Sequence, residues 1–265
     1  GAEVPCVYAD VVRGGPGLGT IQPSQADYFQ ACKGGGNGDY KNIVLAPASV
    51  QEMADFVALG FELAFKYRMA CCILSDGAIG QMMEKVVLPE QKPRMTEEEI
   101  KANYPWATTG RKRGTQHRVI TSLDLDSVKM EAHNRHLQEK YRLVEENEVR
   151  FEEIECEDAE YVFVAYGSSA RIAQKSVQLA RAEGLKVGLL RPITLFPFPS
   201  KAIQNLIDRG AKGFLAVELS CGQMIEDVKL AVNGRVKAEH FGRVGGIIHT
   251  PEEVLEAMKK QIIGE

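Results

Sequence analysis

The sequence lacks several features that would assign it to a membrane-bound or secreted class. No apolar run approaches the roughly 20 residues that are needed to span a bilayer, and no charged segment followed by an apolar one opens the chain. We therefore expect a cytoplasmic protein with no membrane partner.

Closely spaced cysteine pairs are also missing. Six cysteines lie at positions 6, 32, 71, 72, 156 and 221, and no two have the C-x-x-C spacing. This excludes a zinc ribbon or a ferredoxin-type cluster built from these thiols. We expect no metal site, and we interpret most of the cysteines, including Cys71 and Cys72, as buried and unreactive thiols of a reducing compartment.

An excess of positive charge is absent as well. The formal net charge is -4 over 265 residues, which gives no reason to expect nucleic acid as a partner. The hydrophobic content of 45% is ordinary for a globular protein, and the length is enough for two domains.

The first third of the chain contains short apolar runs that end at Gly or Pro. Runs at 4–12, 42–49 and 70–77 are typical of strands buried on both faces of a parallel sheet. Three strands are few for a complete sheet, and the chain opens with Gly1 instead of Met. We therefore expect a partial domain whose amino-terminal part is missing.

The middle of the chain is polar. Residues 88–125 contain three prolines and little periodicity, which predicts a connector with some structure of its own. Apolar residues then recur at helical spacing through 127–151 amid dense charge, which favours a long surface helix bridging two domains. His133 and His136 on this helix are candidates for metal ligands or for solvated surface histidines, and no third ligand accompanies them.

The last hundred or so residues alternate between strand-like and helical patterns. Such alternation predicts a parallel sheet covered by helices on both faces. Thr250, Pro251 and Glu253 mark the start of the last helix. We expect three segments: a partial domain at 1–88, a connector with a long charged helix at 89–152, and a second domain at 153–265.

A glycine-rich stretch, RGGPGLGT at 13–20, directly follows the first apolar run. Its spacing matches neither G-x-G-x-x-G nor G-x-x-x-x-G-K-[ST], so it does not predict a nucleotide site. Arg13, at the carboxyl end of a strand, suits a small carboxylate. The alternative is an ion pair with Asp10 or Asp27, and the glycines could equally serve only the turn.

Three stretches carry a resemblance to a known family. The segment from VYADVVRGGPGLGT onward, AYGSSAR at 165–171 and GLLRPITLFPFP at 188–199 are similar to the α subunit of the 2-oxoacid:ferredoxin oxidoreductases. The 2-oxoisovalerate (branched-chain) type is the nearest. The resemblance runs through essentially the whole chain in the right order.

The resemblance implies a fold and a division of labour. It implies an α/β chain with a partial thiamine-diphosphate pyrimidine-binding-type parallel sheet, followed by a three-layer domain like the carboxy-terminal domain of transketolase. Such enzymes oxidatively decarboxylate a 2-oxoacid, pass electrons to ferredoxin and transfer the acyl group to coenzyme A. A partner β subunit carries the diphosphate and Mg²⁺ site, and another subunit carries iron-sulfur clusters. Whether the fragment also forms a homo-oligomer stays an open question.

The resemblance also implies roles for a few residues. Arg13 would meet the substrate carboxylate, with Gly14 and Gly15 beside it and Thr20 donating one hydrogen bond. The family's glutamate that activates thiamine diphosphate, and its Tyr-Pro-Ile-Thr-Pro loop, are not in this chain. We therefore expect no catalytic residue here, no tightly bound cofactor and an inactive isolated chain.

Some alternatives stay open at this point. The GSSAR stretch at 167–171 could hold an anion such as a phosphate of coenzyme A, or Ser168 or Ser169 could cap a helix. The whole chain could instead be a subunit of a lipoamide-linked 2-oxoacid dehydrogenase or of a transketolase-like enzyme, or a non-catalytic module for subunit docking.

Overall fold

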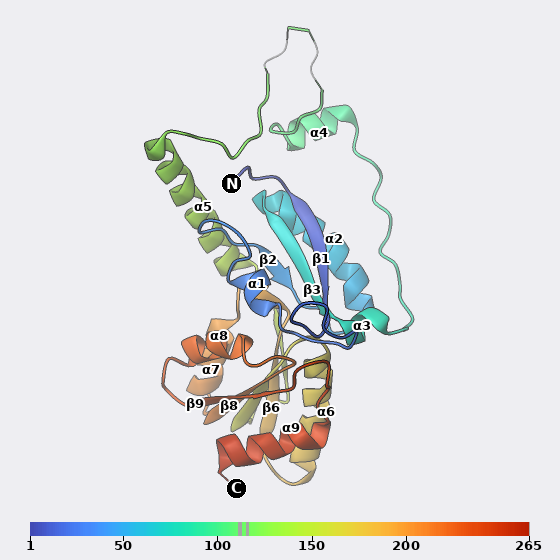
Figure 1. Ribbon diagram of the computed structural model, residues 1–265, viewed down its shortest axis with the longest axis vertical. Helices are drawn as coiled ribbons and strands as arrows, with labels where there is room; N and C mark the ends of the chain where they lie inside the picture. Colours follow the sequence, from blue (N-terminus) through green and yellow to red (C-terminus); the bar gives the residue numbers. More distant parts are fainter. Residues whose placement is uncertain (111–112, 115–116, 265) are drawn as a thin grey trace.

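Two β-sheets with helices packed against them make up the protein (Figure 1). The structure is a computed structural model that describes residues 1–110, 113–114 and 117–264. The predicted connector, 89–152, therefore lies partly outside the described residues. The expected α/β class with parallel sheets is confirmed, although one strand in each sheet runs antiparallel to its neighbour.

The first sheet has the strand order β1-β3-β2-β7. Its strands are β1 (Cys6–Val12), β3 (Ala70–Asp76), β2 (Ile43–Leu45) and β7 (Thr194–Phe196). The prediction that residues 4–12 are buried on both faces is wrong. Strand β1 lies at the edge beside β3, and its residues Tyr8 and Val11 are 41% and 47% exposed.

Helices pack around this sheet. They are α1 (Tyr28–Cys32), α2 (Val50–Tyr67) and α3 (Gly77–Gln81). Helix α2 begins where the Ser49 Oγ accepts a hydrogen bond from Glu52 N at 3.1 Å, and it ends at Arg68, which adopts a left-handed conformation. Its buried face contacts β1, β2 and β3.

The polar middle segment contains two helices, α4 (Glu97–Asn103) and α5 (Ser127–Asn147). The expectation that the connector has structure of its own is thus confirmed. The prediction that the long helix reaches residue 151 is wrong: it ends at Asn147, and Phe151 opens strand β4 (Phe151–Ile154). His133 Nε2 contacts Gly1 O at 2.8 Å and His136 Nε2 contacts Glu3 Oε1 at 3.3 Å, so both side chains face the start of the chain.

The second sheet has the order β4-β6-β5-β8-β9. Besides β4, it contains β6 (Val187–Pro192), β5 (Tyr161–Val164), β8 (Gly213–Glu218) and β9 (Lys237–Gly242). Strands β6 and β8 are buried at every position, as expected for central parallel strands. Strand β4 is an antiparallel edge strand beside β6.

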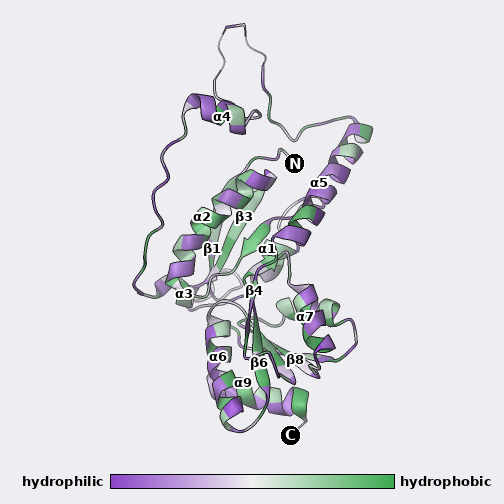
Figure 2. Cartoon of the chain, turned by 180° about the vertical axis from the view of Figure 1, so that it is seen from behind, coloured by the Kyte–Doolittle hydropathy of each residue, from purple (hydrophilic) through white to green (hydrophobic). Residues whose placement is uncertain are grey.

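Helices cover both faces of this sheet, which confirms the predicted three layers (Figures 1 and 2). One face carries α6 (Gly167–Ala182) and α9 (Pro251–Met258), which continues into the π-helix η1 (Lys259–Ile263); the other carries α7 (Ser200–Asp208) and α8 (Met224–Val232). Thr250 and Glu253 form the expected capping box of α9, with Pro251 in its first turn. No helix in the described ranges combines the length and apolar character needed to cross a membrane.

Several contacts tie the two sheets together. Strand β7 belongs to the predicted second domain, but it pairs with β2 of the first sheet. The buried Arg191 of β6 forms an ion pair with Glu52 of α2 at 2.6 Å, and Tyr28 of α1 donates a hydrogen bond to Asp227 of α8. The three proposed segments, 1–88, 89–152 and 153–265, stay a prediction.

Candidate functional site

A cavity of about 720 Å³ lies between the carboxyl ends of strands from both sheets. It is bounded by the end of β1, the segment that follows β8 and the loop that follows β9. Ligand sites of open α/β sheets characteristically form outside the carboxyl ends of the strands. Its lining comprises residues 10–13, 15–17, 24, 26–27, 219–221, 223 and 244–245.

The glycine-rich turn that lines one side, residues 13–24, is called the Arg13 loop below. Gly14 N donates to Gln22 O at 2.8 Å and Thr20 N donates to Gly14 O at 2.7 Å, so the loop folds back on itself. Gly19 has a φ of +51°, and a Cβ there would lie 1.8 Å from Gly14 O. At least this glycine is therefore required by the turn itself.

Arg13 stands at the start of this loop and lines the cavity. Its guanidinium donates to four carbonyls of its own loop: Nη2 to Gly17 O at 3.3 Å, and Nη1 to Leu18 O, to Gly14 O at 3.4 Å and to Thr20 O at 3.5 Å. Within the described chain it forms no ion pair with Asp10 or Asp27, so the predicted alternative role is wrong. Arginine has five N–H donors. Because Nη1 serves three of these carbonyls and Nη2 serves one, the Nε–H and the second N–H of Nη2 are the donors left for a carboxylate.

Two acidic residues share the cavity with Arg13. Asp10 lies near the end of β1 and Asp27 lies just before α1. Burial, together with the neighbouring Asp27 carboxylate, raises the pKa of Asp10 above its ordinary value. An anionic ligand is therefore repelled at the acidic side of the cavity and attracted at the arginine side.

The other residues predicted for substrate binding lie in two places. Gly15 lines the cavity beside Arg13. Gly14 and Thr20 lie where the Arg13 loop meets the loop after β9: Thr20 Oγ1 donates to Gly245 O at 3.4 Å, and a Cβ on Gly14 would lie 3.1 Å from the Gly245 carbonyl carbon. Thr20 is thus placed to hold two loops together.

The start of helix α6 differs from one of the two sequence-based alternatives, the serine cap. The Asp76 carboxylate, at the end of β3, accepts a hydrogen bond from Ser168 N at 2.9 Å. Ser169 Oγ instead donates to Gln25, and the helix has no side-chain cap from either serine. The prediction of serine capping is therefore wrong. The Asp76 carboxylate also disfavours an external phosphate at this helix start.

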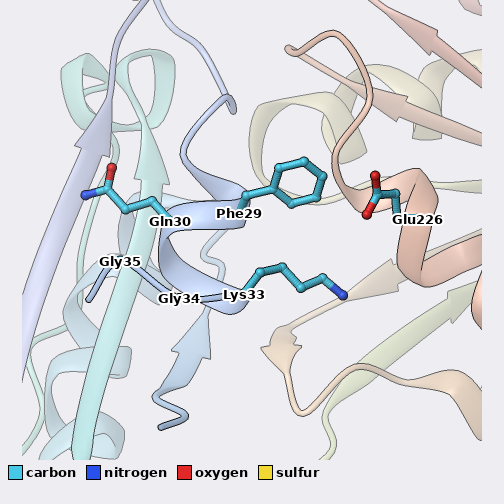
Figure 3. A pocket seen from close by; sticks show the side chains of 6 residues that line it. All are labelled: Phe29, Gln30, Lys33, Gly34, Gly35 and Glu226. Atoms are coloured by element: carbon cyan, nitrogen blue, oxygen red, sulfur yellow. The ribbon is translucent and has the colours of Figure 1, made fainter. Parts of the chain in front are cut away.

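A second, more open cavity of about 820 Å³ lies beside α1 (Figure 3). Figure 3 shows Phe29 and Lys33 of α1 directed toward the side where Glu226 of α8 lies. Lys33 is already paired with Asp227. Because its lysine is paired, this cavity offers a weaker anion site than the one that contains Arg13.

We did not predict from the sequence that the second sheet contributes to the cavity that Arg13 lines, which is called the main cavity below. Leu219, Cys221 and Gln223 follow β8, and Val244 follows β9. These residues could have been predicted from their position directly after two parallel strands, because the carboxyl ends of such strands lie at the same edge of the sheet, where ligands bind. The described residues contain no cluster of three or more His, Cys, Asp and Glu side chains that could hold a metal ion.

Comparison with known families gives two matches that together span almost all of the chain. Residues 1–155 match the family described as pyruvate flavodoxin/ferredoxin oxidoreductase, thiamine diP-bdg. Residues 159–254 match pyruvate:ferredoxin oxidoreductase core domain II. The boundary between the two matches falls just after β4.

Individual relatives include two enzyme subunits and one solved structure. The ketoisovalerate oxidoreductase subunit VorB of Methanothermobacter marburgensis is 51% identical over 100% of this chain and 73% of that protein. The 2-oxoglutarate synthase subunit KorA of Methanocaldococcus jannaschii is 35% identical over 97% of this chain and 74% of that protein. A 2-oxoglutarate:ferredoxin oxidoreductase from Magnetococcus marinus shares the fold, with a TM-score of 0.76 and 24% identity over 98% of this chain and 49% of that one.

Proposed function

Because the chain belongs to the pyruvate flavodoxin/ferredoxin oxidoreductase family, we propose that it presents Arg13 to the carboxylate of a 2-oxoacid. The complete enzyme would decarboxylate this acid oxidatively, with electrons passing to ferredoxin and the acyl group to coenzyme A. The observation that carries the proposal is the position of Arg13 on the wall of the cavity between the two sheets.

The proposed substrate is 2-oxoisovalerate. The relative named as a ketoisovalerate oxidoreductase subunit is 51% identical, whereas the one named as a 2-oxoglutarate synthase subunit is 35% identical. Val11 and Val244 line the cavity and are 47% and 51% exposed, so they give it an apolar part. A branched aliphatic side chain suits such a surface, since its burial there removes apolar area from water.

The charges of the cavity would orient the substrate. The guanidinium of Arg13 would hold a carboxylate through its Nε–H and the second N–H of Nη2, whereas Asp10 and Asp27, which line the same cavity, would repel it. The carboxylate would therefore lie at the arginine side, and the 2-oxo carbon would face the open part of the cavity. Such fixed orientation lowers the entropic part of the activation barrier.

The cavity has room for part of thiamine diphosphate, but its lining does not suit the diphosphate end. Its volume lies within the usual range for small-molecule sites, so it can accept a substrate next to part of a second group. The described residues offer no carboxylate cluster for Mg²⁺ and a diphosphate. We propose that the partner β subunit holds that end; when bound, the cofactor supplies the carbanion that attacks the 2-oxo carbon.

An apolar surface beside the cavity supports docking of this partner. Leu18 and Ile21 of the Arg13 loop are 93% and 78% exposed, and Val244 and Ile247 in the adjoining loop are about half exposed. Thr20 joins the two loops through its hydrogen bond to Gly245. Exposed apolar residues that adjoin in this way are typical of an interface, so a partner bound here would close the cavity from water.

Viologen reduction by the chain coexpressed with its partner subunits tests the proposal. The rate is measured with coenzyme A and with 2-oxoisovalerate, pyruvate or 2-oxoglutarate. We expect the highest kcat/KM for 2-oxoisovalerate. Absence of turnover with every 2-oxoacid would refute the proposed activity, and reduction of lipoamide in place of viologen would favour the dehydrogenase alternative.

A further inference from the structure

Gln25, which follows the Arg13 loop, makes an unusually complete set of contacts with the second sheet. Its side chain is 1% exposed. The Nε2 donates to Tyr166 O at 2.9 Å, and the Oε1 accepts hydrogen bonds from Ser169 Oγ at 2.8 Å and from Leu219 N at 2.9 Å. The backbone of Gln25 adds two more bonds, from its N to Leu219 O at 2.8 Å and from the Tyr166 hydroxyl to its O at 3.3 Å.

These partners come from two neighbouring strands of the second sheet. Tyr166 and Ser169 lie at the start of α6, just after β5, and Leu219 directly follows β8. His249, just before α9, extends the network because its Nε2 lies 3.2 Å from Ser169 Oγ. Since Ser169 gives its one hydroxyl proton to Gln25, the Nε2 of His249 is the donor in this contact.

Backbone pairing within the Arg13 loop connects Gln25 to Arg13. Arg13 pairs with Pro23 as an antiparallel bridge, Gly14 N donates to Gln22 O, and Ser24 N donates to Val12 O at 3.2 Å. Arg13 therefore lies across a short ladder from Pro23, two residues before Gln25. Displacement of Gln25 would shift this ladder and the guanidinium with it.

We propose that Gln25 is a positioning residue, which fixes the Arg13 loop to the second sheet and so places Arg13 for the substrate carboxylate. This inference rests on the proposed function, because the placement matters only if Arg13 binds the 2-oxoacid. The second sheet then contributes to substrate binding through the Gln25 amide as well as through the cavity wall.

Gln25 could instead only stabilise the contact between the two sheets, without placing Arg13. A matched variant separates the two roles. Tyr28→Phe removes another contact between the sheets, the hydrogen bond from Tyr28 to Asp227, without touching the Arg13 loop. Gln25→Met keeps the length of the side chain and removes its three hydrogen bonds. If Gln25 only stabilises the contact between the sheets, both variants should affect the Arg13 loop equally.

The first readout is hydrogen exchange of the Gly14 and Thr20 amides in the full complex, because both amides are bonded within the Arg13 loop. We expect Gln25→Met to speed their exchange by about tenfold or more, and Tyr28→Phe to leave it near the wild-type rate. The second readout is the KM for 2-oxoisovalerate. It should rise about tenfold in Gln25→Met, with kcat within about twofold.

A second variant, Gln25→Glu, gives a pH signature that loss of packing would not produce. A protonated carboxyl can donate to Tyr166 O and accept from Leu219 N, as the amide does, whereas an ionised carboxylate has no proton to donate. The KM of this variant should approach the wild-type value at low pH and rise as the introduced carboxyl ionises. Tyr28→Phe should follow the wild-type pH profile.

Two outcomes would overturn the inference. The first is amide exchange in Gln25→Met equal to that in Tyr28→Phe; the second is a pH profile of Gln25→Glu parallel to that of the wild type. If the wild-type complex turns over no 2-oxoacid, the proposed function fails, while the exchange rates still decide whether Gln25 anchors the loop.

Discussion

Asp76 and Ser168 join the two sheets through one buried hydrogen bond: the Asp76 Oδ2 accepts the Ser168 backbone N–H at 2.9 Å. The other oxygen of Asp76 accepts from Ala78 N and Ile79 N and so caps α3. One carboxylate thus serves the first turns of two helices that belong to different sheets. This arrangement leads to the first prediction.

Replacement of Asp76 by alanine should lower the free energy of unfolding by about 2 to 4 kcal/mol, since it removes two helix caps and leaves the buried Ser168 N–H without a partner. The control is Asp126→Ala, which removes the exposed cap of α5 alone and should cost about 1 kcal/mol. Urea unfolding measures both values. Equal losses would contradict a shared capping role for Asp76.

His249 should make the protein sensitive to acid. Burial lowers the pKa of His249 from an ordinary 6.5 to about 4, and the neighbouring Glu253 opposes the shift while Arg243 and His240 reinforce it. The unfolded chain then binds a proton at higher pH than the folded chain. The contribution of His249 to stability is therefore present above pH 6.5 and is lost as the pH falls toward 4.

We expect this loss to amount to roughly 2 kcal/mol between about pH 7 and pH 5. His249→Gln keeps a donor for Ser169 Oγ and does not titrate. The measurement is urea unfolding of both proteins across this range. The free energy of unfolding of the wild type, relative to that of His249→Gln, should fall by this amount between about pH 7 and pH 5. Parallel curves would show that His249 does not titrate on unfolding.

The cysteines should fall into two reactivity classes. Cys6 and Cys221 are exposed, whereas Cys32, Cys71, Cys72 and Cys156 are buried. Burial raises the pKa of Cys71 and of Cys72 to about 12, so little thiolate forms at neutral pH.

Alkylation with iodoacetamide, followed by mass spectrometry, should therefore modify Cys6 and Cys221 first. Because Cys221 lines the main cavity, saturating 2-oxoisovalerate should slow its modification. Cys6 lies on β1 and serves as the internal control. Rapid modification of Cys71, or equal protection of Cys6 and Cys221, would contradict the described burial or the proposed site.

Much of the fold could be predicted from the sequence where burial is complete. Strands β6 and β8 are mostly apolar and are buried along their length because helices cover both faces, and the alternation with helices then indicates a three-layer sheet. Two edge strands, β7 and β4, gave no such signal. Strand β7 has three residues, and β4 is mostly exposed, so neither shows a recognisable pattern of apolar residues.

The candidate site was predictable only in part. Arg13 was predicted from its place in the RGGP stretch and from the family resemblance. The comparisons confirm the family, while the role of Arg13 stays a prediction. Gln25 was missed because a polar residue in a loop has no periodic pattern, and its partners lie about 140 to 195 positions away in sequence. Asp76 displaced the predicted serine caps for the same reason, since the chain brings β3 to the start of α6 only in the folded state.

The central claim is that Arg13 binds the carboxylate of the 2-oxoacid. The most direct measurement is kcat/KM for 2-oxoisovalerate of Arg13→Ala in the assembled complex. The control is Arg135→Ala, which removes an exposed arginine paired with Glu131 on α5. We predict a fall of roughly 100-fold or more for Arg13→Ala, through loss of a charge-assisted contact, and little change for the control. Equal kcat/KM in Arg13→Ala and wild type would contradict the account.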